Sequence, residues 1–224
     1  MNKKYKYVNE KGQTITGPTA KIILEHTSDE KYLSDDGVVQ VSKERWKKAQ
    51  KYELSEWVER APHFTDDRNF FHKDRFNNYS SLKGYPHVTS FIELGCGPFT
   101  NARIILDYFP NIEKITLLDP LAEKYQQQHP HCQYKDSSIR IGSSCHDVEV
   151  ISSPIEEFNT SQKYDIVVMI NVLEHCYDIP AIFNKIEEIL APEGLFVYAD
   201  VQLTLEDIKQ MTTNTYNAGH KPRS

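Results

Sequence analysis

The sequence predicts an α/β fold whose centre is a doubly wound, mainly parallel β-sheet. The first reason is that segments with strand and helix character alternate from residue 88 to residue 200. The second is that residues 164–170 form a nearly unbroken apolar run, which is typical of a parallel strand buried on both faces. The third is a short strand that leads through two glycines into an apolar helical pattern, over residues 90–109. Such alternation favours a parallel sheet with right-handed crossovers.

Composition and charge indicate one domain of ordinary size with a smaller appendage. The chain has 224 residues, of which 39% are hydrophobic and 26% charged, and its formal net charge is −6. No apolar run approaches the roughly 18 residues of a membrane span, and no apolar stretch follows the basic start, so we expect neither a membrane span nor a signal peptide. The four cysteines form no C-x-x-C pair, which favours free thiols in a reducing cytoplasm. The N-terminal lysines alternate with acids, so nucleic-acid binding is not expected.

Residues 1–85 are predicted to form an N-terminal appendage of a hairpin and helices. Residues 5–15 alternate apolar and polar side chains around an Asn-Glu-Lys-Gly turn, as in a small hairpin. A short helix at residues 19–26 and a loop at residues 34–37 are expected to follow.

The appendage also contains an amphipathic helix, from Ser42, which can cap it, to near Pro62. Trp46 and Trp57 lie on its apolar face. These tryptophans either belong to the core or line a substrate pocket. The aromatic and basic residues of segment 62–85 suit either a lid over a small-molecule site or packing of the appendage against the sheet.

Residues 86–200 are predicted to form the ligand-binding sheet domain, with five strands at residues 91–94, 114–118, 148–151, 164–170 and 195–199. Residues 131–146 are expected to form a long polar connection. Residues 201–224 are predicted to form a C-terminal helix, at residues 205–212, and a tail without strand character. One edge of the sheet would then need a second copy, a partner protein or the N-terminal hairpin to cover it, unless the chain is truncated.

The turn after the first strand indicates which ligand the sheet binds. A strand, a glycine turn and a helix can present backbone N–H groups to a ligand. A dinucleotide fingerprint needs a glycine where this chain has Thr100, and Glu93 would repel a pyrophosphate. Asp119, 22 residues beyond Gly97, ends the second strand and can accept hydrogen bonds from both hydroxyls of a ribose. The predicted ligand has a ribose and a positive charge but no pyrophosphate.

Five segments, in order and at suitable spacing, resemble the motifs of class I S-adenosylmethionine-dependent methyltransferases. The similarity covers about half of the chain and implies their Rossmann-like fold, here with the last two strands apparently missing. The segments are Glu93-Leu94-Gly95-Cys96-Gly97-Pro98, Leu118-Asp119-Pro120-Leu121, residues 150–157, Asp165 to His175 with its Val-Leu-Glu-His ending, and Leu190-Ala191-Pro192-Glu193-Gly194-Leu195.

The resemblance implies S-adenosylmethionine as cofactor and assigns a role to each matching residue. The glycines would let the backbone approach the methionine part, Glu93 would anchor its amino end, and Asp119 would take the ribose. The expected cofactor-binding residues are Glu93, Gly95, Cys96, Gly97, Asp119, Pro120, Leu121, Ser153, Pro154, Ile155, Asn171 and Val172.

His175 is the candidate catalytic base, although Glu174-His175 could equally cap or pack the next helix. Some relatives hold a metal with Glu-x-x-Glu-His here, but Asn171 replaces the first carboxylate, so we expect no metal. The predicted function is methyl transfer to oxygen or nitrogen of a small molecule, such as a sugar or another secondary metabolite. The alternatives are a cofactor-binding pseudo-enzyme that serves as an interaction partner and, less favoured, an NAD-dependent oxidoreductase.

Overall fold

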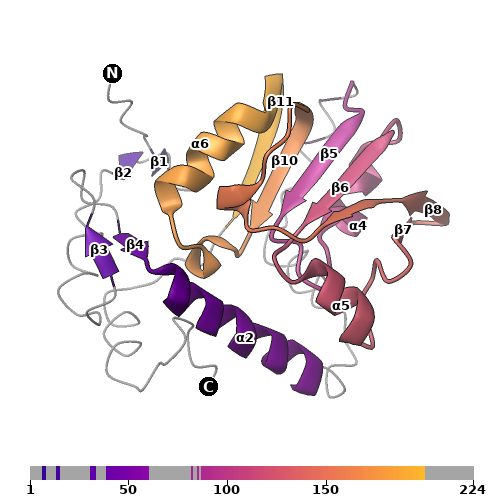
Figure 1. The fold of residues 1–224 in the computed structure, drawn as a ribbon. Coiled ribbons are helices and arrows are strands. Elements are labelled where there is room, and N and C mark those ends of the chain that lie inside the picture. The colour runs from indigo at the N-terminus through magenta and orange to yellow at the C-terminus, as the bar shows by residue number, and fades with distance from the viewer. Residues whose placement is uncertain are drawn as a thin grey trace.

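The computed structural model describes residues 7–8, 14–15, 31–33, 39–60, 82, 85 and 87–199 (Figure 1). Its centre is a five-stranded sheet in the order β11-β10-β5-β6-β9, in which every pairing is parallel. The strands are β5 (Ser90–Leu94), β6 (Lys114–Leu118), β9 (Glu149–Ile151), β10 (Tyr164–Ile170) and β11 (Leu190–Ala199). All five predicted strands are confirmed. The order reverses between β5 and β10, which is where open α/β sheets bind ligands.

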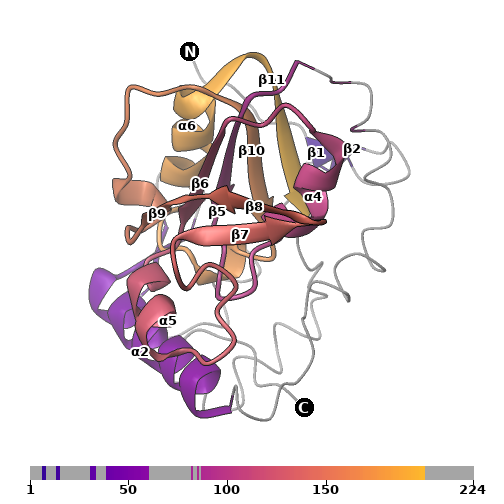
Figure 2. The same ribbon diagram turned by 90° about the vertical axis from the view of Figure 1, so that its right-hand side faces the viewer.

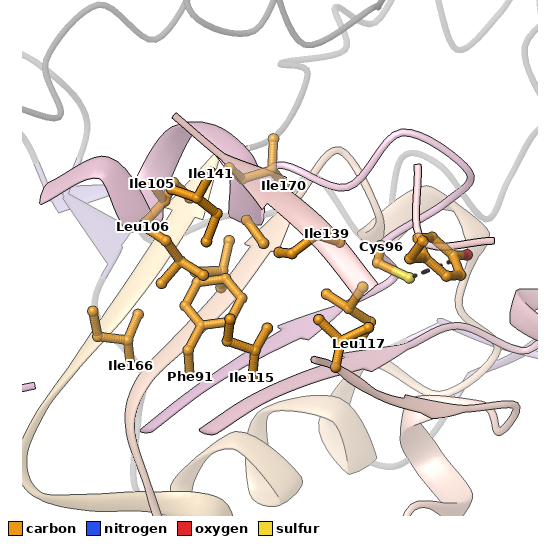
Figure 3. Close-up of a cluster of buried hydrophobic side chains, with 14 of the residues drawn as sticks. Phe91, Cys96, Ile105, Leu106, Ile115, Leu117, Ile139, Ile141, Ile166 and Ile170 are labelled. Carbon is orange, nitrogen blue, oxygen red and sulfur yellow. Dashed lines mark hydrogen bonds between the residues drawn. The ribbon is translucent and has the colours of Figure 1, made fainter. Parts of the chain in front are cut away.

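Alternating side chains of the strands supply two hydrophobic cores, one on each face of the sheet. One core joins Phe91, Ile115 and Ile166 to the helices α4 and α5 and to the short helix η3 (Figure 3). The other joins Ile92 and Met169 to the helix α6. The helical elements of the domain are α4 (Ala102–Ile105), η3 (Leu106–Tyr108), α5 (Ala122–Gln128), η4 (Ile155–Glu157), η5 (Leu173–His175) and α6 (Ile179–Ile189). Because strand residues alternate between faces, Glu93 points toward the face that carries α4.

The amphipathic helix predicted after Ser42 is confirmed as α2 (Lys43–Arg60), whose first turn begins with a bond from the Trp46 N–H to the Ser42 carbonyl, at 2.9 Å. Figure 1 shows α2 lying across the end of the sheet at which the strands finish, beside α5. The N-terminal hairpin is also confirmed, since β1 (Tyr7–Val8) pairs antiparallel with β2 (Thr14–Ile15). No helix among the described residues is long and apolar enough to cross a membrane.

Two expectations need correction. The connection 131–146 contains a hairpin of β7 (Ser138–Ile141) and β8 (Ser144–Asp147), whose strands run crosswise to β5 in Figure 2. Its two-residue turn starts at Gly142, which has a φ of 56°, as type II′ turns require. The predictions missed this hairpin because its outer strand is polar and mostly exposed.

A second missed pair is formed by β3 (Lys31–Leu33) and β4 (Val39–Val41), on either side of the predicted loop. The start of β11 is irregular: Tyr164 pairs with Leu190 but Ile166 pairs with Leu195, so the residues between Leu190 and Leu195 form a bulge. The helices predicted at residues 19–26 and 205–212, and most of segment 62–85, lie outside the described residues.

Asp165 ties the start of β10 to the start of β5. Its Oδ2 atom accepts hydrogen bonds from the backbone N–H groups of Thr89 and Ser90, at 2.9 and 3.0 Å, and from both hydroxyls. Burial acts to raise the pKa of Asp165, but these bonds outweigh it and hold the pKa below 3.8. The ionised carboxylate therefore stabilises the register of the two central strands.

We predict that Asp165→Ala lowers the free energy of unfolding by about 2 kcal/mol, because several bonds to one charged group are lost. Urea denaturation at pH 7 measures the change. A depressed folded-state pKa stabilises the fold above the unfolded-state pKa, so the difference from the natural protein should shrink as the pH falls below 3.8. Asp136→Ala, at an exposed position, is the control and should change little; equal stability of the two variants would contradict the prediction.

Candidate functional site

The ends of β5, β6 and β10 meet at one edge of the sheet, and backbone hydrogen bonds continue past them. The Gly95 N–H donates to the Leu118 carbonyl at 2.7 Å, and the Asp119 N–H donates to the Ile151 carbonyl at 3.1 Å. The Asn171 N–H donates to the Ala199 carbonyl at 2.8 Å. The glycine turn, Asp119 and Asn171 are therefore brought to the same edge, as predicted.

The two glycines of the turn serve different purposes. Gly95 has a φ of 73°, and a Cβ atom there would lie 2.5 Å from the methyl carbons of Val172. Only glycine allows the turn to pack against the residue that follows β10. Gly97 has a φ of 54°, and a Cβ atom there would meet nothing within 4 Å. The backbone at Gly97 thus borders open space, which a ligand can approach closely.

The N–H groups of the turn are already used inside the protein, contrary to the expectation that they face a ligand. Those of Gly95 and Cys96 donate to the Leu118 carbonyl, and that of Gly97 donates to Asp119 Oδ2 at 3.0 Å. The Cys96 side chain points into the core, where its thiol lies 3.6 Å from the Tyr134 hydroxyl (Figure 3). This turn does not have the free donors that a pyrophosphate needs.

Glu93 supports the turn from beneath and does not face an open site. Its carboxylate is 1% exposed and accepts bonds from the Thr100 hydroxyl, from the Asn101 backbone and side-chain amides at 2.9 Å, and from the Ala102 N–H at 3.1 Å. Burial raises the pKa of Glu93, and these four bonds oppose the rise. The expected contact with a cationic ligand is corrected accordingly, because both oxygens are turned toward α4.

Asp119 is the acid at the edge of the open space. Its Oδ1 accepts the Leu121 N–H at 2.8 Å and its Oδ2 accepts the Gly97 N–H at 3.0 Å, so each oxygen keeps a lone pair for a further donor. Burial raises the pKa of Asp119 to about 6; the charge of Glu53 adds to the rise, and the two N–H bonds and His175 oppose it. A buried acid with fixed, spare acceptor positions fits the two hydroxyls of a ribose.

The residues expected around an adenine lie at the neighbouring strand end, after β9. Ile155 is 2% exposed and belongs to the core beneath the edge, whereas Ser153 and Pro154 are half-buried at its rim. Ser153 Oγ is 3.1 Å from the Pro154 carbonyl and donates to it. On the β6 side, Leu121 is buried and Pro120 is half-buried. The residues after β6 and those after β9 therefore border the same corner of the sheet edge.

The segment after β10 places the candidate base close to the acid. Asn171 has a φ of 58° and is half-buried, and Val172 is buried against Gly95. His175 ends η5, and it lies near enough to Asp119 for its charge to lower the pKa of that acid. His175 therefore lies close enough to Asp119 for the two groups to interact electrostatically.

Helix α2 closes this region from outside, and its N-terminal half is anchored on η5. The Trp46 indole N–H donates to the His175 carbonyl at 3.0 Å, and its ring packs edge-on against Tyr177, with centroids 5.2 Å apart. Lys43 forms an ion pair with Glu157 at 2.7 Å.

The C-terminal half of α2 is anchored on the glycine turn and α5. Trp57 packs against Phe99 at 5.7 Å and against His129 at 6.0 Å, measured between ring centroids. Burial lowers the pKa of His129 to about 4, so this imidazole is neutral at physiological pH and suits an aromatic cluster. The two anchors hold α2 over the space between them.

Sequence reasoning missed the residues that support the site. Thr100 and Asn101 hold Glu93, and the Tyr134 hydroxyl donates to the Gly97 carbonyl at 2.8 Å. These contacts join segments far apart in the chain, and no periodicity encodes them. For Glu53 the sequence holds a weak indication of a role at the site, because it is an acid on the otherwise apolar face of a helix.

Metal binding finds no support in the part of the chain that the structure describes. No three His, Cys, Asp or Glu side chains there are placed to hold an ion. The expectation that the site works without a metal stays a prediction.

Comparisons with known proteins place the chain in a family. A family model described as a methyltransferase domain matches residues 43–221. A search of curated proteins finds no match. Similar solved structures include the N-methyltransferase NodS from Bradyrhizobium japonicum WM9 with S-adenosyl-L-homocysteine, at 17% identity over 68% of this chain and 70% of that chain, with a TM-score of 0.47.

Two further structures are similar to the same extent. The DhpI complex with SAH shares 16% identity over 70% of this chain and 69% of that chain, with a TM-score of 0.49. The plantazolicin methyltransferase BpumL, bound to a triazolic desmethylPZN analogue and SAH, shares 17% identity over 79% and 70%, with a TM-score of 0.47. The family assignment depends on the domain match, which spans most of the chain and includes α2. The chain belongs to the class I S-adenosylmethionine-dependent methyltransferases, and S-adenosylmethionine is its cofactor.

Proposed function

We propose that this chain is an active methyltransferase that acts on oxygen or nitrogen of a small molecule, such as a sugar or another secondary metabolite. The observation that carries the proposal is Asp119, a buried acid held by two backbone N–H groups beside the open space at Gly97. When bound, the cofactor supplies an electrophilic methyl group on a sulfonium sulfur. The protein has to hold it, align the acceptor and exclude water.

The cofactor would lie along the edge from the glycine turn to the loop after β9. Asp119 would accept the ribose hydroxyls, and Gly97 would let the backbone approach the methionine part. Glu93 would act through the turn, since its carboxylate is fully engaged there. The adenine would lie among a set of buried and half-buried side chains that we assign to its corner: Pro120, Leu121, Ser153, Pro154 and Ile155.

His175 is our candidate for the base that takes the acceptor proton. An imidazole titrates near neutrality, and this one lies at the end of the strand that leads to the switch point. The Trp46 indole N–H bonds to the backbone carbonyl of His175, so this bond does not involve the His175 side chain. Asn171 and Val172 would border the methyl group.

A second candidate function, a cofactor-binding interaction partner, is supported by the outer edge of the sheet. Within the described residues β11 pairs only with β10, and Tyr198 on β11 is 39% exposed. A partner protein or a second copy could pair with this strand. The oxidoreductase alternative loses support, because the N–H groups of the turn are not available to a pyrophosphate.

Calorimetric titration tests the cofactor site. We expect S-adenosylmethionine and its demethylated product to bind with micromolar or tighter dissociation constants, and NAD not to bind. Asp119→Asn should weaken S-adenosylmethionine at least about tenfold, because a charged acceptor of two hydroxyls is lost. Asp136→Asn, at an exposed position, is the control. Failure of the methyl donor to bind would refute the proposed function.

The same binding should depend on pH through Asp119. The ionised carboxylate is the better acceptor, so binding favours loss of the proton, and the dissociation constant should rise as the pH falls through about 6. Titrations between pH 5 and 8 measure the effect. The Asp119→Asn variant should bind weakly and with little change over this range; a steep pH dependence in that variant would assign the titration to another group.

Substitution of His175 separates catalysis from binding. His175→Ala should abolish methyl transfer to an accepted substrate and leave the dissociation constant of S-adenosylmethionine within about twofold, because the Trp46 bond is made to the backbone carbonyl. Rates of S-adenosylhomocysteine release, with and without acceptor, give the measurement. Undiminished turnover would assign His175 to packing.

A further inference from the structure

The connection between α5 and β7 holds the glycine turn at two consecutive carbonyl groups. The Tyr134 hydroxyl donates to the Gly97 carbonyl at 2.8 Å, and the Gln133 N–H donates to the Pro98 carbonyl at 3.0 Å. Tyr134 lies 37 residues beyond Gly97, outside the five segments that resemble methyltransferase motifs. The turn therefore depends on a contact from a part of the chain to which no cofactor role has been assigned.

Tyr134 is itself held firmly in place. Its side chain is fully buried, and its own carbonyl accepts the Gln126 side-chain amide from α5 at 3.0 Å. The Cys96 thiol lies 3.6 Å from its hydroxyl. Burial raises the pKa of Tyr134 well above its usual range, so the hydroxyl keeps its proton throughout the physiological pH range. Tyr134 is therefore a fixed donor to the turn.

Gly97 transmits this contact to Asp119. Its φ is 54°, and because glycine adopts positive and negative φ about equally well, neighbouring contacts must select this conformation. The carbonyl of Gly97 is held by Tyr134, and its N–H is held by Asp119 Oδ2 at 3.0 Å. Loss of the first bond would allow Gly97 to rotate, which would weaken the second.

We propose that Tyr134 is a positioning residue of the cofactor site, whose hydroxyl holds Gly97 so that the Gly97 N–H stays on Asp119 and the acid is ready to accept the cofactor ribose. This inference rests on the proposed role of Asp119 in ribose binding. Tyr134 acts through Gly97, because its ring belongs to the hydrophobic core beside the turn.

The contact should affect how readily Asp119 takes up a proton. Burial raises the pKa of Asp119 to about 6, and the N–H bonds from Leu121 and Gly97 oppose the rise. A hydrogen bond to the charged form favours that form, so a weaker Gly97 bond raises the pKa of Asp119 further. Because the ionised acid is the better acceptor for ribose hydroxyls, cofactor affinity would then be lost at a higher pH.

Other titratable groups around Asp119 stay the same in this comparison. The charges of Glu53 on α2 and His175 on η5 act on the acid. Tyr125 on α5 and Cys96 in the turn are buried, and burial raises the pKa of each, so both stay neutral near pH 7. All four side chains are kept when only the Tyr134 hydroxyl is removed, so a difference between the two proteins reports on that hydroxyl.

Tyr134→Phe tests the inference, because it removes the hydroxyl and keeps the buried ring. The natural protein and the variant are titrated calorimetrically with S-adenosylhomocysteine between pH 5 and 8. At pH 8 the dissociation constant should rise about three- to tenfold, since one buried bond that positions the site is lost. The midpoint of the pH dependence should move upward from about 6, by at least about half a pH unit.

A double substitution shows whether the effect passes through Asp119. In the Asp119→Asn protein the acid can no longer ionise, so adding Tyr134→Phe should change the dissociation constant less than about twofold. Equal effects of Tyr134→Phe in the two backgrounds would mean that the hydroxyl and the acid act independently.

Tyr164→Phe is the matched control. Tyr164 is also fully buried, and its hydroxyl donates to the Thr116 hydroxyl at 3.3 Å, but it stands at the start of β10, away from the edge that carries the site. Urea denaturation should show a comparable loss of stability in both tyrosine variants, whereas Tyr164→Phe should bind S-adenosylhomocysteine with the natural dissociation constant and midpoint.

A second variant acts on the same connection from the half-buried face of α5. Gln126→Met removes the amide that holds the Tyr134 carbonyl without emptying the core. It should weaken binding in the same direction, by about two- to threefold. If Tyr134→Phe does not fold, this variant decides the question, and unchanged binding would then assign Tyr134 to stability alone.

The inference is overturned if Tyr134→Phe folds and binds as the natural protein does, or if its loss of affinity is the same at every pH. Its failure is distinguishable from failure of the proposed function. Normal binding to the natural protein, with no shift in Tyr134→Phe, refutes the positioning role alone. A natural protein that does not bind S-adenosylhomocysteine refutes both.

Discussion

The buried carboxylate of Glu93 is the contact on which the site depends. It lies on the central strand, on the face that carries α4, and four donors from Thr100, Asn101 and Ala102 converge on it. These bonds fix the start of α4. They therefore also fix the path of the turn between β5 and α4. Gly95 can then press against Val172, and Gly97 can donate to Asp119. One acid inside the sheet thus aligns three strand ends.

The second constraint is the cover that α2 provides. Burial beneath it makes an ionised Asp119 costly, and Glu53 on the same helix adds to the cost. The helix is nevertheless held at both ends, by Trp46 on η5 and by Trp57 on the cluster of Phe99 and His129. Two aromatic anchors therefore fix the helix that covers this edge of the sheet.

The parallel sheet and the residues at its edge could be predicted because short-range patterns encode them. Apolar runs predicted β5, β6 and β10. The polar residues that follow β6 and β10, Asp119 and Asn171, were predicted to lie at the edge of the sheet, and the structure has them there. The role of Glu93 could not be predicted in this way. A carboxylate two residues before a glycine looks the same whether it faces a ligand or the start of a helix, and only the pairing of strands decides between them. The β7–β8 hairpin was missed for a related reason, since β8 has little apolar pattern.

The same distinction explains why the methyl donor was easier to predict than the acceptor. In the proposed binding mode the donor contacts turns whose geometry is dictated by the sheet, so glycine positions and a strand-end acid suffice to predict it. In the proposed site the acceptor would lie where α2 meets the sheet edge, and α2 can change its inner residues without disturbing any strand. The inner residues of α2 can be identified only after the contacts of Trp46 and Trp57 have shown which face of the helix is turned inward. In the proposed site, the residues that select the acceptor would therefore lie on the cover helix, where no strand or glycine pattern encodes them.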